Sequence, residues 1–460
     1  MTSESDCAVS GTAPATRTHS WRRRIVRRGL AATAVGLVLA SVLAACGTKS
    51  SSSGGTVTLH VQTLTGPQAQ DMQVMAQAYE ASHPNVKIQI DALADVASKM
   101  PNVAVLNGSN PPDVGFVQYD GGAYAAELAN NKLTPLTDIW QSNNLAKHYG
   151  PSVTKQYTVN GSQYAVLWDT VYIAPMYYNV DAFAKAGITV TNHRITLPQF
   201  YDAVSKLKAN GYQGLGVGGN TSYHLGHLVD MLLQTAATPA QYDSLLTNWQ
   251  GSVPATVKYT DPAFVNTLQT LKDFQSNGVF QSGMLSQDYT QAEALFAAGK
   301  LGMFMGGTWT PSELNGSLKV PFKYDYILPP TLNPAQTTKF EGVATDAFVL
   351  PLKSKHPTQA KDFLKFVGSA QGQTAVAKGG LLPIFADLPA SDLTTIGPVV
   401  SSILQDVKTN GSAGLWDSLV PNTIGQPFGV PKYQALLSGQ SSVQQVASEF
   451  QTELDKLRAG

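Results

Sequence analysis

The sequence predicts an α/β fold, and two features of the chain point to that class. Residues 56–61 alternate apolar and polar side chains as a strand does, residues 69–82 repeat apolar side chains at helical spacing, and residues 86–90 form a second strand. A strand, a helix and a strand with short joints between them build a parallel α/β unit. The length of 460 residues allows two domains with further segments.

The composition of the chain excludes some classes of partner. Hydrophobic residues make up 43% and charged residues 13%, and the formal net charge is zero. Because binding to phosphate backbones requires a basic excess, we expect no nucleic acid partner. The two cysteines, Cys7 and Cys46, do not supply a disulfide framework.

The first 45 residues are predicted to be a signal peptide. A basic segment at 21–28 precedes an apolar run at 30–45, which is short for a membrane span and typical of an export signal. The run ends in Leu43-Ala-Ala-Cys46-Gly47, which resembles the lipobox of bacterial lipoproteins. That resemblance implies that Cys46 is lipidated and becomes the new N-terminus. The alternative is a cysteine at the end of an uncleaved anchor, and the export route, general or twin-arginine, stays open.

Residues 46–55 are predicted to be a lipidated tether. Four serines and two glycines follow Lys49, and a flexible coil of about ten residues spans roughly 15–20 Å. Two acyl chains anchor a protein stably where one does not. We therefore expect an extracytoplasmic protein held at the outer face of the bacterial cell membrane, which touches the membrane only through its N-terminal lipid.

The next elements end in side chains suited to ligand binding. Residues 111–117 form a third strand behind two prolines, and its end delivers Gln118, Tyr119 and Asp120 to the carboxyl edge of the sheet. Residues 159–164 form a hairpin, because Asn-Gly favours the type I′ turn. Trp168 and Asp169 follow the hairpin, and they precede the apolar run 171–178 and a short helix at 179–186.

A glycine-rich stretch follows the amphipathic helix predicted at 197–210. Residues 214–219 match G-x-G-x-x-G in letters, but a dinucleotide site requires a strand before the motif and a helix after it. Here a helix precedes the motif, so we favour a strand that opens into a ligand-facing loop, Asn220 to His224, and we expect no cofactor. His224 and His227 alone indicate zinc weakly. A polar rim or a helix cap is the alternative, and no metal is expected.

Residues 295–309 contain the most informative pattern in the chain. Leu295 and Phe296 end a helix, which Gly299 stops because glycine adopts the left-handed terminal conformation readily. A short buried strand follows and ends in two glycines, which let another molecule approach the backbone closely. Trp309 then presents a large flat face just past the end of the strand. The alternative is a core tryptophan after an ordinary turn.

The last third of the chain continues the α/β pattern. Residues 323–327 and 345–351 are predicted strands, and residues 358–377 are a predicted helix that Gly379, Gly380 and Pro383 stop. Residues 402–410 and 443–457 are predicted amphipathic helices, with Trp416 and Asp417 between them.

Several of these stretches, taken in order, resemble family 1 of the extracellular solute-binding proteins, the carbohydrate-binding proteins of ABC importers typified by maltose-binding protein. The matches are F-x-x-G-x-x-(G/A)-M-x-x-x-G-x-W at 296–309, the NGxxY…YYNxDxFxKxGI segment at 160–188, the crossover at 341–346 and the helix with its GGxxP stop at 360–383. Leu167 stands where the family has a proline.

The resemblance implies two lobes, each a mixed and mainly parallel sheet flanked by helices, joined by a hinge of several strands. The N-terminal lobe would comprise residues 56–170 and 343–405, and the C-terminal lobe residues 171–342 and 406–460. It also implies a carbohydrate ligand, a partnership with the transmembrane subunits of an ABC permease, and a monomer.

The chemistry of the side chains and their positions at strand ends predict the ligand residues. Aromatic planes cover the flat faces of a sugar, while carboxylates and amides hydrogen-bond its hydroxyls in a concave site with few polar groups. The candidate residues are Thr65, Tyr119, Asp120, Trp168, Asp169, Asn220, His224, Trp309, Asp346, Trp416 and Asp417. The resemblance gives most weight to Asp120, Trp309 and Asp346, and Phe428 is a rival of Trp416. The alternatives are helix caps for the acids and core positions for the tryptophans.

Two functions of different classes fit this pattern. The first is a receptor that closes on a sugar by a hinge and is not an enzyme. The second is a secreted glycoside hydrolase, which needs two carboxylates roughly 5–10 Å apart; Asp120 with Asp346, or Asp169 with Glu341, could supply them. The chain lacks a nucleophile elbow, a zinc-helix motif and a phosphate loop, and we favour the receptor.

Overall fold

The computed structural model describes most of the chain as one compact unit that spans residues 54–460. The described residues are 55–93, 103–118, 132–344, 346–385 and 387–459. The predicted signal peptide, the lipidation site Cys46, nearly all of the tether, Tyr119 and Asp120 lie outside them. Among the described residues, no helix combines the length and the apolar character that a bilayer span requires.

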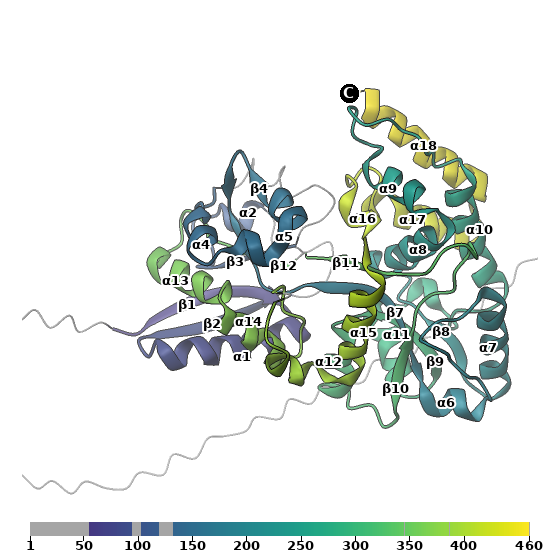
Figure 1. Cartoon of the computed structure of the whole chain (residues 1–460), viewed down its shortest axis with the longest axis horizontal. Coiled ribbons are helices and arrows are strands. Elements are labelled where there is room, and N and C mark those ends of the chain that lie inside the picture. Colours follow the sequence, from purple (N-terminus) through teal and green to yellow (C-terminus); the bar gives the residue numbers. More distant parts are fainter. Residues whose placement is uncertain (1–54, 94–102, 119–131, 345, 386, 460) are drawn as a thin grey trace, which may run out of the picture. The chain divides into compact units, whose positions relative to one another are not determined.

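Two large hydrophobic cores organise the compact unit, and we name them the first core and the second core (Figure 1). The elements that pack around the first core are β1 (Val57–Leu64), α1 (Pro67–Ser82), β2 (Val86–Leu93), α2 (Val103–Leu106), β3 (Gly115–Gln118), α4 (Thr137–Ser142), α5 (Leu145–Gln156), β4 (Thr158–Val159), β5 (Ser162–Gln163), β6 (Ala165–Leu167), β12 (Asp346–Val349), α13 (Pro357–Val367) and α14 (Ala370–Gly379). These elements come from two stretches of sequence, β1 to β6 and β12 to α14, which are about 180 residues apart. The elements β7 to β11 of the second core lie between them in the sequence.

The remaining elements surround the second core, with a 3-10 helix between the two sets. They are β7 (Val171–Asn179), α6 (Val180–Lys185), α7 (Leu197–Ala209), β8 (Gln213–Gly216), α8 (Ser222–Ala236), α9 (Pro239–Thr247), α10 (Pro262–Ser276), η1 (Met284–Ser286), α11 (Tyr289–Ala297), β9 (Leu301–Gly307), α12 (Thr310–Asn315), β10 (Tyr324–Ile327), β11 (Phe340–Val343), α15 (Gly397–Asn410), β13 (Ser412–Gly414), α16 (Trp416–Leu419), α17 (Gln426–Leu437) and α18 (Val443–Ala459). The 3-10 helix η2 (Ala390–Ile396) contacts α14 and α15.

The sheets of the first core confirm the predicted parallel unit. β1 pairs with β2 in parallel, and α1 connects the two strands. β3 lies parallel to β1 through the bridge between Val61 and Val114. β12 lies antiparallel between β3 and β6, and it therefore returns the chain to this sheet after the second core. The predicted hairpin is β4 and β5, with Asn160 and Gly161 at positive φ.

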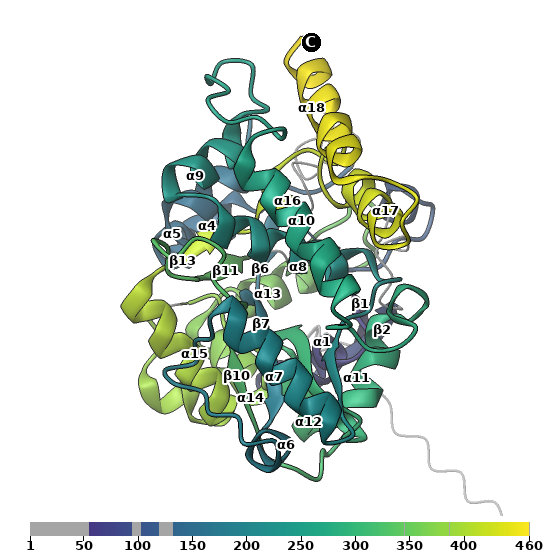
Figure 2. The ribbon, with the colours of Figure 1, turned by 90° about the vertical axis from the view of Figure 1, so that its right-hand side faces the viewer.

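The sheet of the second core has the order β13-β11-β7-β9-β8, and β10 pairs with β7. β8 and β9 are parallel, whereas β7 and β9 are antiparallel. Helix α7 packs on β8 and helix α8 on β7 and β9. Figure 2 shows α7, α8 and β7 of this group. Two strands, β7 and β11, lie side by side where the chain passes between the cores, with Glu341 opposite Ile173.

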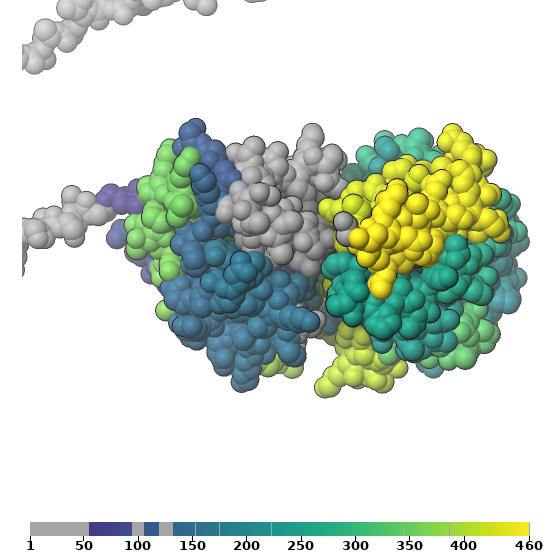
Figure 3. Space-filling model, turned by 90° about the horizontal axis from the view of Figure 1, so that it is seen from above, coloured from purple at the N-terminus to yellow at the C-terminus, as the bar shows by residue number. Residues whose placement is uncertain are grey.

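The space-filling view shows how the two sets of residues group by sequence. The green atoms of α13 lie with the blue amino-terminal elements, and the yellow atoms of α17 and α18 cover teal elements (Figure 3). The contacts agree, because α13 packs on α1 and β6 while α17 and α18 pack on α8 and α10.

One expectation about local structure was wrong in detail. The predicted helix at 358–377 is two helices, α13 and α14, because the side chain of Ser369 accepts a hydrogen bond from the amide of Gly372 and starts a new helix. The glycine motif at 214–219 agrees with its prediction, because it follows helix α7 and begins within strand β8, which opens into the loop before α8.

The glycines of this motif pack against other backbone segments of the same chain. A Cβ atom at Gly214 would lie 2.2 Å from the carbonyl oxygen of Val279, and one at Gly218 would lie 2.4 Å from the amide nitrogen of Tyr289. These glycines allow close packing of backbone on backbone. The glycines of this motif therefore serve the packing of β8 and of the loop after it against neighbouring backbone.

Candidate ligand-binding site

Trp309 lies where the two cores meet. It lies two residues after the end of β9 and directly precedes the first residue of α12. Its half-buried indole packs against the hydrophobic residues of both cores. The indole Nε1 donates a hydrogen bond of 3.0 Å to the hydroxyl of Tyr289, and the ring of Tyr223 meets the indole edge-on with centroids 6.4 Å apart. The orientation of the indole plane is therefore fixed by neighbours before any ligand binds.

Gly307 makes this orientation possible. A Cβ atom at Gly307 would lie 1.9 Å from a carbon atom of the Trp309 ring, so the indole rests directly on the backbone of the strand. The carbonyl of Gly307 accepts a hydrogen bond of 2.7 Å from Tyr177. We expected these terminal glycines to admit another molecule; at Gly307 the space is occupied by the indole of the same chain.

Acidic side chains surround Tyr289, the residue that holds the indole. The hydroxyl of Tyr289 donates to Glu313 at 2.6 Å and also lies 3.5 Å from Glu293. Burial, followed by the charge of Glu313, raises the pKa of Glu293 to about 10. On the side away from Tyr289, a Cβ atom at Gly66 would lie 3.7 Å from Oε1 of Glu313. Glu313 thus faces the residue before the first turn of α1.

A second group of carboxyls lies at the carboxyl edge of the first sheet. Asp346, at the start of β12, accepts hydrogen bonds from Gln118 at 2.8 Å and from Gln68 at 3.5 Å. Asp169 and Asp71 are buried close to it, and their carboxyl oxygens have no hydrogen-bond partner of normal geometry within the protein. Buried polar atoms that the protein leaves unsatisfied are rare and often mark sites that bind something else.

The electrostatics of these carboxyls follow from burial and from one another. Burial raises the pKa of Asp169 well above its usual range, and the charges of Asp346 and Asp71 raise it further. Burial also raises the pKa of Asp71, which a backbone donor at Leu381 only partly offsets. Each of these groups thus favours its protonated form in the protein as it stands.

Three predicted residues at strand and loop ends have simpler surroundings. Thr65 is exposed and precedes Gly66, and its amide donates to the carbonyl of Leu93. Asn220 is exposed in the loop before α8. Trp168 is fully buried in the first core against Phe348, and its Nε1 has no partner within the protein.

His224 is a structural residue, which corrects its prediction as a loop residue that faces the ligand. It lies inside α8 and is almost fully buried. Its Nδ1 accepts from the amide of Gly218 at 2.8 Å, so the proton is on Nε2, which donates to the carbonyl of Met305 at 2.8 Å. Burial lowers the pKa of His224 to about 4, and that of the neighbouring His227 to about 3. Both imidazoles are neutral at physiological pH.

Trp416 lies inside the second core, so the structure does not place it at a surface that a ligand could reach. Its ring is 1% exposed and packs against Tyr259, Phe264 and Phe450. This is the core position that we weighed as the alternative. We leave Trp416 out of the site proposed below.

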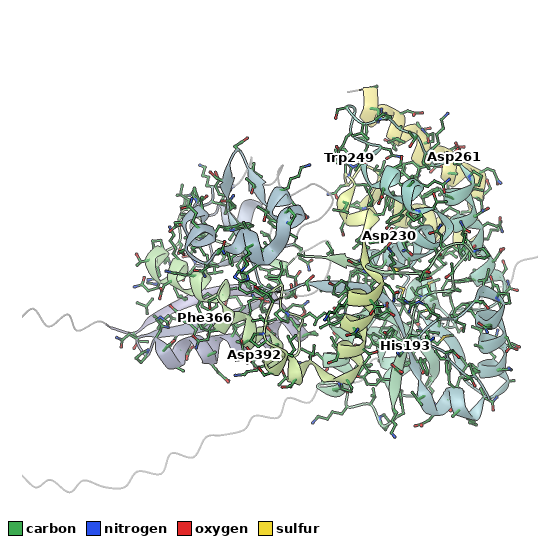
Figure 4. All side chains as sticks on the ribbon, viewed as in Figure 1. His193, Asp230, Trp249, Asp261, Phe366 and Asp392 are labelled. Carbon is green, nitrogen blue, oxygen red and sulfur yellow. The ribbon has the colours of Figure 1, made fainter. Side chains whose placement is uncertain are left out.

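Asp417 belongs to a buried acid cluster, which we define as Asp230, Glu341 and Asp417. The amide of Asp417 donates to Asp230 on α8, and its carboxylate accepts from Gln426 at 2.6 Å (Figure 4, where Asp230 is labelled). Burial raises the pKa of Asp230 and of Glu341 well above their usual ranges. The described residues contain no group of three His, Cys, Asp or Glu side chains that could hold a metal. We treat the cluster as structural.

The proton on Glu341 can be located from hydrogen-bond geometry. The hydroxyl of Tyr242 lies 2.9 Å from the carbonyl of Gly414 and 2.5 Å from Oε1 of Glu341. The hydroxyl carries one proton and the carbonyl only accepts. Both contacts are satisfied when Tyr242 donates to Gly414 and a protonated Glu341 donates to Tyr242.

The candidate site combines one oriented aromatic plane with a group of amides and carboxyls, and Glu313 beside Gly66 links the two. Its members are Trp309, Tyr289, Tyr223 and Glu313 from the second core, with Gln68, Gln118 and Asp346 from the first. Sequence analysis found Trp309 and Asp346. It placed Gln118 at the carboxyl edge of the sheet without choosing it as a ligand residue. It missed Tyr289, Tyr223, Glu313 and Gln68, of which Tyr289 carried a signal, since it begins the helix that leads to Trp309.

Comparison with known proteins finds relatives that match over most of the chain. The family model described as bacterial extracellular solute-binding protein matches residues 63–374. An uncharacterised ABC transporter extracellular-binding protein of Pyrococcus horikoshii is 24% identical over 389 residues, which are 81% of this chain and 83% of the relative. An sn-glycerol-3-phosphate-binding periplasmic protein of Rhizobium meliloti is 25% identical over 43% of this chain and 45% of its own length.

A solved structure supports the fold over a longer stretch. A chitin oligosaccharide binding protein superposes with a TM-score of 0.73 and 22% sequence identity, covering 88% of this chain and 100% of its own.

Proposed function

The chain belongs to the family of bacterial extracellular solute-binding proteins, and on that premise we propose that it captures a sugar or an oligosaccharide and delivers it to an ABC permease. Members of this family bind solutes outside the cytoplasm and are not enzymes, and this holds for the present chain. Its predicted α/β class is confirmed, with the fold of periplasmic binding proteins.

The proposal assigns the two cores to two lobes. Residues 56–170 with 343–405 would form one lobe, and residues 171–342 with 406–460 the other. The two separate hydrophobic cores support this division at residues 170 and 171, since the first contains Trp168 and the second begins at Val171, whereas Val343 and Ile403 belong to the second core. The adjacent strands β7 and β11 would then belong to the hinge.

Trp309 carries the proposal. Its indole contacts both cores and is oriented by Tyr289 and Gly307, so it presents a preformed plane where the lobes meet. A sugar ring stacked on that plane places its hydroxyls near the amides and carboxyls of Gln68, Gln118 and Asp346. Contacts to both lobes stabilise a closed form over an open one, because a ligand shifts the equilibrium by its differential affinity.

The remaining parts of the proposal concern export and anchoring. The signal peptide, the lipid on Cys46, the flexible tether and a monomeric state complete a receptor that stays near its permease without entering the membrane. The basic and apolar segments before Cys46 support them.

A thermal-shift panel tests the proposed function. The protein without its first 46 residues, which retains the compact unit 54–460, is heated with mono- and oligosaccharides. A ligand at 100 times its Kd stabilises the native state by about 2.7 kcal/mol, so at least one sugar should raise Tm by several degrees. The same sugar should be recovered chemically unchanged. A panel without any shift, or cleavage of the sugar by the pure protein, would contradict the proposal.

Gly307→Ala is expected to weaken binding of the sugar found in that panel by at least tenfold. The added methyl group would overlap the indole of Trp309, which must tilt away and lose its orientation. Isothermal titration measures the loss, and near-ultraviolet circular dichroism reports the change around the indole. Gly251→Ala is the matched control, because a Cβ atom there has no neighbour within 4 Å. Equal affinity of the two variants would show that the packing on Gly307 does not matter for binding.

A further inference from the structure

We propose that Thr310 is a positioning residue of the receptor, whose hydroxyl holds Trp309 in the orientation in which the indole meets a sugar. This inference rests on the proposed function and goes beyond it, because Thr310 is not among the predicted ligand residues. The observation that carries it is the place of the Thr310 hydroxyl, which joins the last residue of β9 to the tyrosine that holds the indole.

Thr310 is fully buried, and its hydroxyl contacts two groups. The residue begins α12 directly after Trp309, and none of its surface is exposed. Its Oγ1 accepts a hydrogen bond of 3.2 Å from the amide of Gly307 and lies 3.1 Å from the hydroxyl of Tyr289. A sugar stacked on the indole therefore does not contact Thr310, and Thr310 acts on binding through its neighbours.

The direction of each hydrogen bond around Tyr289 follows from the chemistry of its partners. The indole Nε1 of Trp309 only donates, so the Tyr289 oxygen accepts from it. The same hydroxyl lies 2.6 Å from Oε2 of Glu313, within the range of about 2.5–2.7 Å for a hydroxyl that donates to a carboxylate. Because Tyr289 gives its single proton to Glu313, Thr310 is the donor in its contact with Tyr289.

The ionisation of the neighbouring acids agrees with these directions. Burial, followed by the charge of Glu313, raises the pKa of Glu293 to about 10, so Glu293 keeps its proton near pH 7. Burial and the charge of Glu313 also raise the pKa of Tyr289 well above its usual range, so the phenol keeps the proton that it donates. The negative charge of this group therefore lies on Glu313, the acceptor that the short distance indicates.

Two consecutive glycines let the side chains of Thr310 and Trp309 lie directly on the backbone of β9. A Cβ atom at Gly306 would lie 2.3 Å from Oγ1 of Thr310, and one at Gly307 would lie 1.9 Å from the indole. The branched Cβ of threonine also restricts rotation about χ1. The Thr310 hydroxyl is thus held between the strand and the phenol of Tyr289, and it is part of the same packed unit as the indole.

Loss of this hydroxyl would loosen both supports of the indole at once. The amide of Gly307 would lose its buried acceptor, and the phenol of Tyr289 would lose a donor. These two residues fix the plane of Trp309. An indole that is free to turn must be ordered when the sugar binds, and that ordering costs entropy.

Thr310→Val tests the inference, because it replaces the hydroxyl with a methyl group of nearly the same size. We expect it to weaken binding of the sugar found by thermal shift by about fivefold in isothermal titration. It should also change the near-ultraviolet circular dichroism of the protein without ligand, which reports on the surroundings of the indole. Thr310→Ser retains the hydroxyl and should recover most of the affinity and the spectrum of the parent.

Thr267→Val is the matched control for a general loss of stability. Thr267 is a fully buried threonine of α10, and its hydroxyl donates to the carbonyl of Ala263. Its replacement should lower Tm and leave affinity unchanged.

A double-variant comparison separates positioning through Tyr289 from simple packing. Tyr289→Phe removes the phenol oxygen alone. If Thr310 acts through that oxygen, the combination of Tyr289→Phe with Thr310→Val should weaken binding by less than the product of the two single effects. Two independent residues would give the full product, which would overturn the inference.

The outcomes distinguish this inference from the function beneath it. A Thr310→Val variant that folds and binds the sugar as tightly as the parent, or an equal loss for Thr310→Val and Thr310→Ser, overturns the role of Thr310 and leaves the receptor in place. If Thr310→Val does not fold, Thr310→Ala and Thr310→Ser replace the pair, since they differ by the hydroxyl alone. Weaker binding by the alanine variant then supports the inference, and equal binding overturns it. Failure of the parent to bind any carbohydrate contradicts the receptor itself.

Discussion

Trp309→Ala is expected to weaken carbohydrate binding by at least tenfold, which corresponds to about 1.4 kcal/mol. The indole supplies a large apolar plane, and its orientation is already fixed by the Tyr289 hydroxyl and by the backbone of Gly307. A preorganised group loses little entropy on binding, so its removal takes away most of what stacking contributes. Isothermal titration with the sugar identified by thermal shift measures the effect.

Trp249→Ala is the matched control for this variant. Trp249 is also partly buried against the second core, and its Nε1 donates to the carbonyl of Leu246 (Figure 4). Its removal should affect Tm and leave affinity unchanged. If Trp309→Ala folds normally and binds as the parent does, Trp309 is a packing residue and the proposed site is wrong.

The thermal stability is expected to fall as the pH rises from about 6.5 to 8. Burial raises the pKa of Asp71, Asp169, Asp230 and Glu341 above their unfolded values, and that of Glu293 to about 10. In this window the unfolded chain has these groups ionised while the native protein still binds the proton of Glu293, which therefore lowers the free energy of unfolding by about 1.4 kcal/mol per pH unit. The raised pKa values of the other four carboxyls act in the same direction.

Other titratable groups affect the stability in other pH ranges. The change of stability above pH 6.5 therefore reports on the buried carboxyls. The pKa values of His224 and His227 are lowered, so their contribution is lost only as the pH falls below about 6.5. The carboxyls with lowered pKa values, such as those of Asp138 and Glu449, lose their contribution only below about pH 4.5. Scanning calorimetry at intervals of half a pH unit would show the decline.

Glu341→Gln should flatten this decline and raise Tm at pH 8. The amide keeps a donor toward Tyr242, as the protonated acid does, and it cannot ionise. Glu453→Gln, a change at a residue paired on the surface with Lys456, is the control and should leave the slope unaltered. A stability that rises between pH 6.5 and 8, or a marked loss on Glu341→Gln at pH 8, would show that Glu341 is ionised in the native protein.

Local patterns explain why much of the fold could be predicted. Period-two and helical spacing identified β1, α1 and β2, and the Asn160-Gly161 pair identified the hairpin, because these signals depend on neighbouring residues alone. Gly299 ends a helix at φ 68°, as its position after the apolar spacing predicted.

Other elements depend on contacts that a single sequence does not display. Helix α17 contains Pro431 and has little amphipathic contrast, so its burial against α8 and α18 had to be seen in three dimensions. The break between α13 and α14 depends on a single capping serine, Ser369.

The candidate site also contains some residues that local sequence predicted and others that only tertiary packing brings together. Trp309 and Asp346 stand at strand ends, where position alone indicates a ligand. Asp71 occupies an ordinary buried position of a helix, and its nearness to Asp169 follows from how α1 packs on the sheet. Trp416 and Asp417 have the right chemistry for a sugar, yet tertiary packing placed both inside the second core.

We propose that two lobes close around a ligand that binds between them. The distance between two spin labels, one on each proposed lobe, tests this closure directly. The chain has no cysteine after Cys46, so Lys155→Cys on α5 and Asp243→Cys on α9, both exposed, can carry a spin-label pair in the protein without its first 46 residues. We expect a saturating sugar to shorten the mean distance between the labels and to narrow its distribution, and we expect the parent distribution to return when the intact sugar is removed. An unchanged distribution at full saturation would contradict the proposed closure.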